Sequence, residues 1–199
     1  MEIKPLTLEG RWVRLSPLSL EYYDQLCAIG LDEDLWRVSR TVLRSPEEMR
    51  RYIETALAEQ ERGVSLPFVT IDKPSGTVVG CTRYGSIEPK HRRLEIGWTW
   101  IARNWQRTHV NTEAKLLMLR HAFEVLQCIR VEFKADSTNV KSRQALLRIG
   151  ATEEGTLRNH MIAPGGRITH SVYYSIIESE WPDVKKRLEA RLMRDHDLR

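Results

Sequence analysis

The sequence predicts a mixed α/β fold in which a largely antiparallel sheet is flanked by helices. Three β-rich runs follow one another between residues 66 and 102 with only short turns between them. Helical patterns with capping residues precede and follow these runs. The chain has 199 residues, 41% of them hydrophobic, which is the size and composition of one ordinary globular domain. We therefore expect a single domain over residues 1–199.

The best-marked helix of the N-terminal half covers residues 45–63. Ser45 can cap it, Pro46 suits its first turn, and Gly63 can close it. The runs that follow are short, rich in β-branched residues and separated by turns such as DKPSG, which indicates an antiparallel meander. In chain order we expect a strand at 11–15, a helix at 21–29, the helix at 45–63, and strands at 66–72, 76–87 and 93–102.

A long helix over residues 111–127 has apolar residues around most of its surface, so we expect it to be largely buried. The last helix, at residues 180–194, is highly charged, and we expect it to dock loosely and to fray. Between these two helices we expect a strand at 130–136, a helix at 139–149, and two strands joined at residues 164–166.

Composition argues against several classes of protein. The 31 basic and 27 acidic residues are interleaved, which favours a mixed solvated surface over a nucleic-acid binder. A basic nucleic-acid-associated protein remains an alternative that rests on the pI of about 9.0 alone. No apolar run suits a membrane span or a signal peptide. Three widely spaced cysteines predict neither a disulfide framework nor a zinc site, which fits the cytoplasm, and His160 and His170 are too few for a metal site.

The run NWQRTHVNTEAK, residues 104–115, joins the third strand of the meander to the long helix. A helix N-terminus attracts anions, because its first amides are unpaired and the helix dipole favours negative charge. Arg103 and Arg107 add positive charge at this point. The alternative is purely structural, with Thr108 or Asn111 capping the helix.

Strand alternation over residues 93–102 places Ile96, Trp98 and Trp100 on one face of the sheet. Glu95 falls on the other face, so we expect it to point away from the tryptophans. We expect Trp98 and Trp100 to fill the core, and an aromatic substrate pocket lined by tryptophans is the alternative.

Taken in order, these segments resemble the GNAT superfamily of N-acetyltransferases, and in particular the Rim-type branch that acetylates ribosomal-protein N-termini. The matching signatures are GRWVRL, EIGWTW, QRTHVNTEA, NVKS and IGATEEGTLR, within residues 10–181. The resemblance implies the GNAT fold and acetyl-CoA as acetyl donor. In that family the loop motif is Gln or Arg, two residues, Gly, one residue, then Gly or Ala. Here His109 and Asn111 replace the two small residues, and His109 would either crowd the phosphate or donate a hydrogen bond to it.

The resemblance also implies the site residues. Glu95 is implied as the base that takes the proton of the amine. Ser142 is implied as a donor to the leaving thiolate, because Leu146 stands where many GNAT enzymes carry a tyrosine acid. The residues implied to bind the donor are Trp100, Ile101 and Ala102 through their amides, the loop Gln106, Arg107, Thr108, His109, Val110, Asn111 and Thr112, and the helix residues Asn139, Ser142 and Arg143.

The residues themselves leave simpler roles open. Asn139 is equally well placed to cap its helix, and Glu95 to face solvent or to pair with Arg92 or Arg93.

The function that we expect is acetyl transfer from acetyl-CoA to a primary amine by direct attack, without an enzyme-bound acetyl group. The acceptor is either a protein N-terminus or a small amine. The alternative is a degenerate GNAT domain that binds CoA or a partner without turnover. We also expect a homodimer, with Trp36 or Trp181 at its surface.

Overall fold

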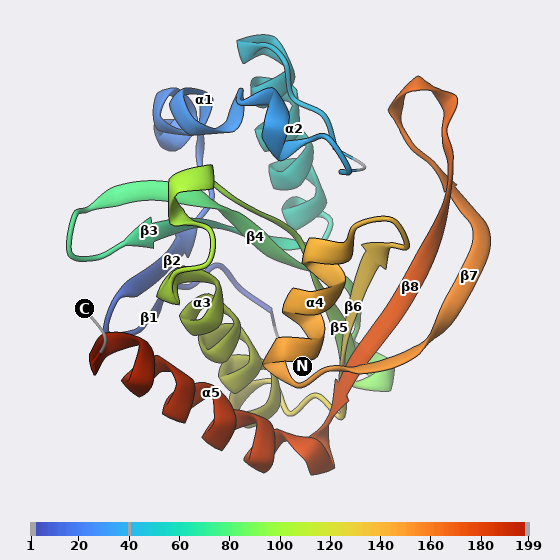
Figure 1. The fold of residues 1–199 in the computed structure, drawn as a ribbon. Coiled ribbons are helices and arrows are strands. Elements are labelled where there is room, and N and C mark those ends of the chain that lie inside the picture. Colours follow the sequence, from blue (N-terminus) through green and yellow to red (C-terminus); the bar gives the residue numbers. More distant parts are fainter. Residues whose placement is uncertain (1–2, 40, 198–199) are drawn as a thin grey trace.

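The computed structural model describes residues 3–39 and 41–197, and it contains an eight-stranded sheet flanked by helices (Figure 1). The strand order is β1-β2-β3-β4-β5-β6-β8-β7, and all neighbours are antiparallel except β5 and β6. The predicted fold class is therefore confirmed. The strands are β1 (Leu8–Glu9), β2 (Val13–Pro17), β3 (Leu66–Asp72), β4 (Thr77–Glu88), β5 (Arg93–Ile101), β6 (Arg130–Asp136), β7 (Thr152–Ile162) and β8 (Ile168–Ile177).

Helices cover both faces of this sheet (Figure 1). Helices α1 (Tyr23–Gly30) and α2 (Pro46–Glu61) pack on one face, which we call the α2 face. On the opposite face, called the α3 face, lie α3 (His109–Arg120), α4 (Val140–Ile149) and α5 (Trp181–Asp197). A separate hydrophobic cluster fills the space on each face, so the sheet is sandwiched between two apolar layers.

Local signals fix the helix ends as the sequence predicts. The Ser45 hydroxyl accepts a hydrogen bond from the Glu48 amide at 3.3 Å, and Pro46 is the first residue of α2. Helix α3 begins two residues earlier than expected, because Thr108 rather than Asn111 is its cap. Its last turn, His121–Val125, is a π-helix.

The C-terminal helix is firmly docked, so the expectation of a loose helix was wrong. Val184 and Leu188 of α5 are at most 1% exposed, and both belong to the cluster on the α3 face. Trp181 stacks on Phe123 at 5.4 Å between ring centroids. Trp36 is also buried, at 4% exposure. Neither tryptophan therefore lies at a surface where a second subunit could contact it.

Strand β5 contains a β-bulge that overturns the predicted alternation. Trp98 has φ +49°, and the register with β4 shifts between Cys81 and Arg83. The extra residue puts Ile96 on the α3 face and Trp100 on the α2 face, instead of together. Glu95 points to the α2 face, the same side as Trp98 and Trp100.

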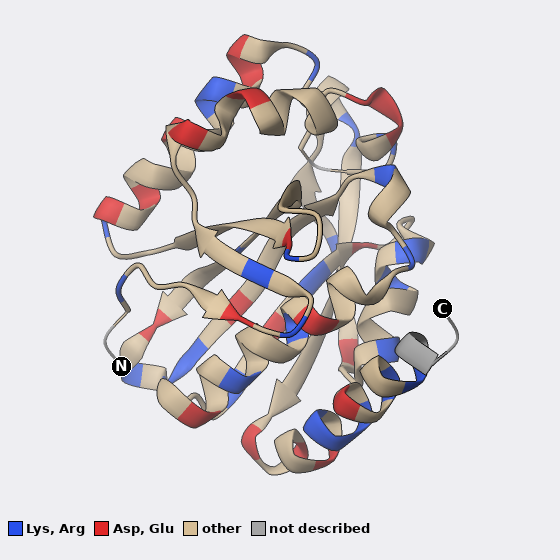
Figure 2. Ribbon diagram, turned by 90° about the vertical axis from the view of Figure 1, so that its left-hand side faces the viewer, with Lys and Arg blue, Asp and Glu red and all other residues tan. Residues whose placement is uncertain are grey.

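Charge is mixed over the ribbon, and Figure 2 shows basic and acidic residues scattered over it rather than gathered in one region. Many of them pair, for example Arg120 with Glu189 between α3 and α5 at 3.0 Å. Among the residues that the structure describes, no helix combines the length and apolar character needed to cross a membrane.

Candidate active site

The main structural feature of the candidate site is a gap between strands β5 and β6. These parallel strands pair only from Arg93 and Arg130 to Glu95 and Glu132. Beyond that point β5 stays with β4 as far as Ile101, while β6 stays with β8 as far as Asp136. Because the two strands diverge, each has an unpaired backbone edge along the gap. Such an edge can bind an extended polar chain through its amide and carbonyl groups.

Ile101 presents its amide to this gap. The Ala102 amide donates to the Val79 carbonyl of β4 at 2.8 Å. Since pairing alternates along an antiparallel strand, Trp100 also faces β4, and Ile101 faces the other way. The side chain of Gln106 donates to the Ile101 carbonyl at 3.0 Å. Of the three amides predicted to polarise the acetyl carbonyl, those of Trp100 and Ala102 are therefore occupied by β4.

The start of α3 lies just beyond the end of β5 and offers amides to an anion. Thr108 caps the helix, with its hydroxyl accepting from the Val110 amide at 3.3 Å and donating to the Trp105 carbonyl at 2.7 Å. The left-handed residue of the loop is Arg107, with φ +60°, and not His109. The backbone here therefore does not require glycine at position 109.

His109 adopts neither of the two arrangements that the sequence suggested. Its ring nitrogen Nε2 lies 3.2 Å from a carboxylate oxygen of Asp72 on β3, and its ring lies 5.8 Å from that of Trp12. The imidazole thus ties the first turn of α3 to the sheet. It is not turned toward an anion at the end of the helix.

The positive charge available at this helix end is smaller than predicted. Arg103 is engaged by Asp34 at 2.6 Å and by Asp32 at 3.6 Å. Among the described residues, the exposed Arg107 has no hydrogen-bond or ion-pair partner, so it is free to reach a phosphate. Asn111 is half-buried and Thr112 is buried, so their contribution to an anion site lies in the backbone. These first-turn amides, Arg107 and the gap together fit a phosphorylated, extended donor such as acetyl-CoA.

Helix α4 borders the gap from the side of β6. Asn139 caps it, with its side-chain oxygen accepting from the Ser142 amide at 3.1 Å. Within the described chain, the hydroxyl of Ser142 has no hydrogen-bond partner. Arg143 bonds the Tyr174 hydroxyl at 3.1 Å and the Ser137 carbonyl at 3.3 Å, so its guanidinium serves the packing of α4 on the sheet. Leu146 is buried.

Glu95 lies on the α2 face, where β5 leaves β6. It is 5% exposed, and its carboxylate binds the amine of Lys134 at 2.7 Å and the hydroxyl of Ser86 at 3.1 Å. Among the described contacts, neither Arg92 nor Arg93 forms the ion pair with Glu95 that the sequence left open. Arg92 donates to the Gln127 carbonyl, and Arg93 pairs with Glu132. Burial, the largest single effect, lowers the pKa of Lys134, but the hydrogen bond and charge of Glu95 together with Tyr173 raise the pKa overall.

Trp98 borders the candidate site, in agreement with the alternative that tryptophans line a pocket. It is 41% exposed, against the expectation of a core residue, and the guanidinium of Arg83 lies 5.0 Å from its ring centroid. A side chain at Gly85 would come within 2.4 Å of this ring, so glycine is needed there. The sequence carried no sign of the bulge that turns Trp98 outward.

Beside Trp98, a pocket of about 230 Å³ opens on the α2 face. Ser86, which contacts Glu95, forms part of its wall. An amine bound in this pocket would meet a carboxylate at one end of the gap, while the first-turn amides of α3 lie near the other end. The polar side chains that line the pocket are Glu59, Ser65, Ser86 and Glu88.

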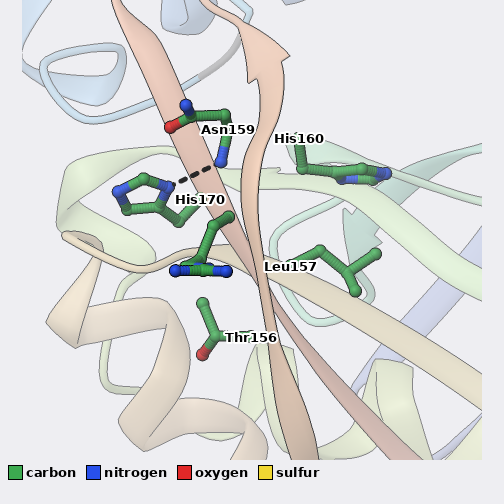
Figure 3. Close-up of a pocket in the computed structure, with 6 residues that line it drawn as sticks. Thr156, Leu157, Asn159, His160 and His170 are labelled. Atoms are coloured by element: carbon green, nitrogen blue, oxygen red, sulfur yellow. Dashed lines mark hydrogen bonds between the residues drawn. The ribbon is translucent and has the colours of Figure 1, made fainter.

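A second hollow, of about 860 Å³, lies along the β7–β8 hairpin at the sheet edge (Figure 3). The two histidines of the hairpin point to opposite sides of it. His170 accepts from the Asn159 amide at 2.8 Å, and His160 bonds the Ser171 hydroxyl at 2.7 Å. In the described part of the chain, no group of three His, Cys, Asp or Glu side chains could hold a metal ion.

Comparison with known proteins matches residues 13–152, more than half of the chain, to the acetyltransferase (GNAT) domain family. A Bacillus subtilis protein named "Putative ribosomal N-acetyltransferase YdaF" is 34% identical over 111 residues, which are 55% of this chain and 59% of that protein. The chain thus matches less than two thirds of this relative's length. The name agrees with the Rim-type branch that the motifs indicated.

Solved structures give the same result over nearly the whole chain. A GCN5-related N-acetyltransferase from Brucella melitensis is 30% identical, with a TM-score of 0.88 over 96% of this chain and 86% of that one. RimJ from Mycobacterium smegmatis, solved in complex with CoA-disulfide, shares the fold at 24% identity, with a TM-score of 0.76 over 90% of this chain and 88% of its own. The resemblance found in the sequence is therefore confirmed: the chain belongs to the acetyltransferase (GNAT) family, and acetyl-CoA is its acetyl donor.

Proposed function

We propose that this chain acetylates a primary amine that enters from the α2 face, with the α-amine of a protein N-terminus as the preferred acceptor. The observation that carries the proposal is the position of Glu95. Glu95 is the last residue of β5 that pairs with β6, next to the gap where an acetyl group can lie, and its carboxylate bonds Ser86 in the wall of the pocket beside Trp98. The preference for a protein N-terminus is supported by the name of the Bacillus subtilis relative. A small amine is the second acceptor class.

In this proposal Glu95 takes the proton of the attacking amine, directly or through water, and Lys134 holds the carboxylate in place. The Ile101 amide faces the acetyl carbonyl. The amides of His109 and Asn111, together with Arg107, hold the pyrophosphate, because the Val110 amide is occupied by the Thr108 hydroxyl. Ser142 faces the thiol end, as the resemblance implies.

The test has two steps. Calorimetry with acetyl-CoA measures donor binding, and thiol release in the presence of peptides or small amines measures turnover. Peptides with a free N-terminus and the same peptides with a blocked N-terminus separate the two acceptor classes. We expect Glu95→Gln to lower kcat by about 10²-fold or more with an unchanged Kd for acetyl-CoA. Binding without turnover on any amine would support the degenerate domain instead.

We further propose a cytoplasmic location and a homodimer. The free thiols of Cys27 and Cys81 support a reducing compartment. The tip of the β7–β8 hairpin exposes Ile162 and Ile168 at 76% and 59%, which supports a second copy covering it. Light scattering of wild-type protein and of an Ile162→Lys variant tests the dimer: a monomeric mass for wild type contradicts it.

A further inference from the structure

Lys115 places an amine inside the protein core. The residue lies on α3 and is 4% exposed. Its Nζ donates to the hydroxyl of Thr99 at 2.7 Å and to that of Thr82 at 3.3 Å. Among the described residues these hydroxyls are its hydrogen-bond partners, and no carboxylate lies within ion-pair distance. Burying a cation without a counter-charge is costly, and leucine or methionine would fill the same space. Packing alone therefore does not explain a lysine here.

The charged groups around Lys115 are all engaged elsewhere. On α3 itself, the buried carboxylate of Glu113 accepts the amides of residues 11–13 at 2.6 to 2.9 Å. On the neighbouring strands β4 and β5, Arg83 and Glu95 point to the opposite face of the sheet, where each has an ion-pair partner. Other charged pairs on the α3 face are His109 with Asp72, Arg120 with Glu189, and Lys185 with Glu124. The amine thus has a polar path in one direction, along its two hydroxyl partners.

That path leads to the gap between β5 and β6. Thr82 is 2% exposed and lies inside, on β4. Thr99 lies 2.8 Å from it, oxygen to oxygen, but is solvent-exposed. Thr99 stands four residues beyond the last residue of β5 that pairs with β6, so it belongs to the exposed stretch of β5 that borders the gap where the acetyl donor fits. The Lys115 amine is therefore hydrogen-bonded to the Thr99 hydroxyl, which in turn lies beside the gap.

We propose that Thr99 gives a proton to the thiolate that leaves during acetyl transfer, and that Lys115 supplies this proton through Thr99. The inference rests on the proposed function. The acceptor nitrogen bonds the acetyl carbon, and the carbon–sulfur bond breaks with its electron pair on sulfur. The hydroxyl proton of Thr99 passes to sulfur, and a proton of the Lys115 ammonium passes to the Thr99 oxygen. Glu95 takes the proton of the amine, and Lys115 regains its own from solvent once the gap empties.

Two observations agree with this assignment. Burial lowers the pKa of Lys115 to about 7, which is the strength that suits an acid working near neutral pH. The tyrosine that many relatives use as the acid is replaced by the buried Leu146, so the reaction needs another proton source.

The test uses CoA itself and needs no acceptor. Calorimetry first establishes that CoA binds to the wild type and to Thr99→Val, Lys115→Met, Ser142→Ala and the control Lys186→Met. The ultraviolet absorption of the thiolate is then followed against pH in each complex. In the wild type we expect the bound thiol to ionise at a pH at least about one unit below that of free CoA, because the Thr99 hydroxyl, itself bonded by the Lys115 amine, can donate to the thiolate.

The variants separate this role from a structural one. Thr99→Val and Lys115→Met should return the thiol to the pH range of free CoA, whereas Lys186→Met, which removes an exposed amine on α5, should keep the shift. Once turnover screening has identified the acceptor amine, Thr99→Val and Lys115→Met should each also lower kcat by about 10²-fold and leave KM unchanged. The alkaline limb of the kcat profile should disappear in Lys115→Met.

Some results would overturn the inference. If CoA binds every variant but the thiol ionises identically in the wild type and Thr99→Val, or if the shift follows Ser142 instead, Thr99 is not the donor. If CoA does not bind the wild type, the proposed function fails first, and the inference fails with it. The calorimetric step tells these two failures apart.

Discussion

Replacing Lys115 with methionine should stabilise the protein, and by an amount that depends on pH. Methionine fills a similar space without a charge. Burial lowers the pKa of Lys115 from 10.5 to about 7 in the folded state. A difference of that size corresponds to roughly 5 kcal/mol between the charged and neutral amine in the core. Below about pH 7 the amine is charged in the folded wild type, so the wild type is destabilised by the whole cost of burying this charge. The variant has no such charge to bury.

The sign of the pH dependence follows from where each state releases its proton. Between about pH 7 and 10.5 the unfolded wild type keeps the lysine proton, while the folded protein has lost it. Because the unfolded state binds more protons there, wild-type stability relative to the variant rises with pH, by up to about 1.4 kcal/mol per pH unit. The stability advantage of Lys115→Met is therefore largest at and below neutral pH and shrinks toward pH 10.

Urea unfolding of both proteins at several pH values between about 6 and 10 measures this difference. Lys186→Met, on the exposed face of α5, is the matched control, because it removes the same charge from a solvated position. The control should differ from the wild type by a small amount that hardly changes with pH. A constant difference between Lys115→Met and the wild type across the whole range would refute the reasoning, since the buried amine would then titrate like an exposed one.

Three further substitutions test individual contacts. His109→Gly should lower the free energy of unfolding by about 1 to 2 kcal/mol, because it removes the contact with β3. The Kd for acetyl-CoA should stay within about threefold of the wild-type value. A tenfold tighter Kd would show that the ring obstructs the donor. Glu113→Gln should cost about 3 kcal/mol in urea unfolding, because three amides share this carboxylate, and a loss below 1 kcal/mol would contradict the geometry. Gly85→Ala should displace Trp98 and raise KM for the acceptor while acetyl-CoA affinity stays constant, and an unchanged KM would place the acceptor elsewhere.

The order and type of the elements could be predicted because they depend on local signals. Ser45, Pro46 and Gly150 mark helix ends by chemistry that acts within a few residues. The docking of α5 could also have been predicted, because one face of this helix is apolar. The apolar residues are three to four positions apart: Trp181, Val184, Leu188 and Leu192. The high charge on the other faces of that helix led to the prediction of loose docking instead.

The details of the site could not be predicted because they arise between elements. Nothing near Trp98 in the sequence indicates a bulge, because the bulge depends on the pairing of β5 with β4, whose register shifts between Cys81 and Arg83. The partner of Glu95 is Lys134, on a strand about 40 residues away, rather than the neighbouring arginines. The orientation of His109 likewise depends on Asp72 of β3. A motif indicates which residues gather at a site, but pairings of this kind decide which groups remain free.

The bulge at Trp98 also connects the two chemical roles that we propose. In a regular strand Glu95 and Thr99 are four residues apart and point to the same face. The extra residue reverses the alternation between them, so that Glu95 faces the acceptor pocket on the α2 face while Thr99 faces Lys115 on the α3 face. A base for the amine and an acid for the thiolate can then act from opposite sides of one gap without neutralising each other. A single inserted residue thereby gives one strand both functions.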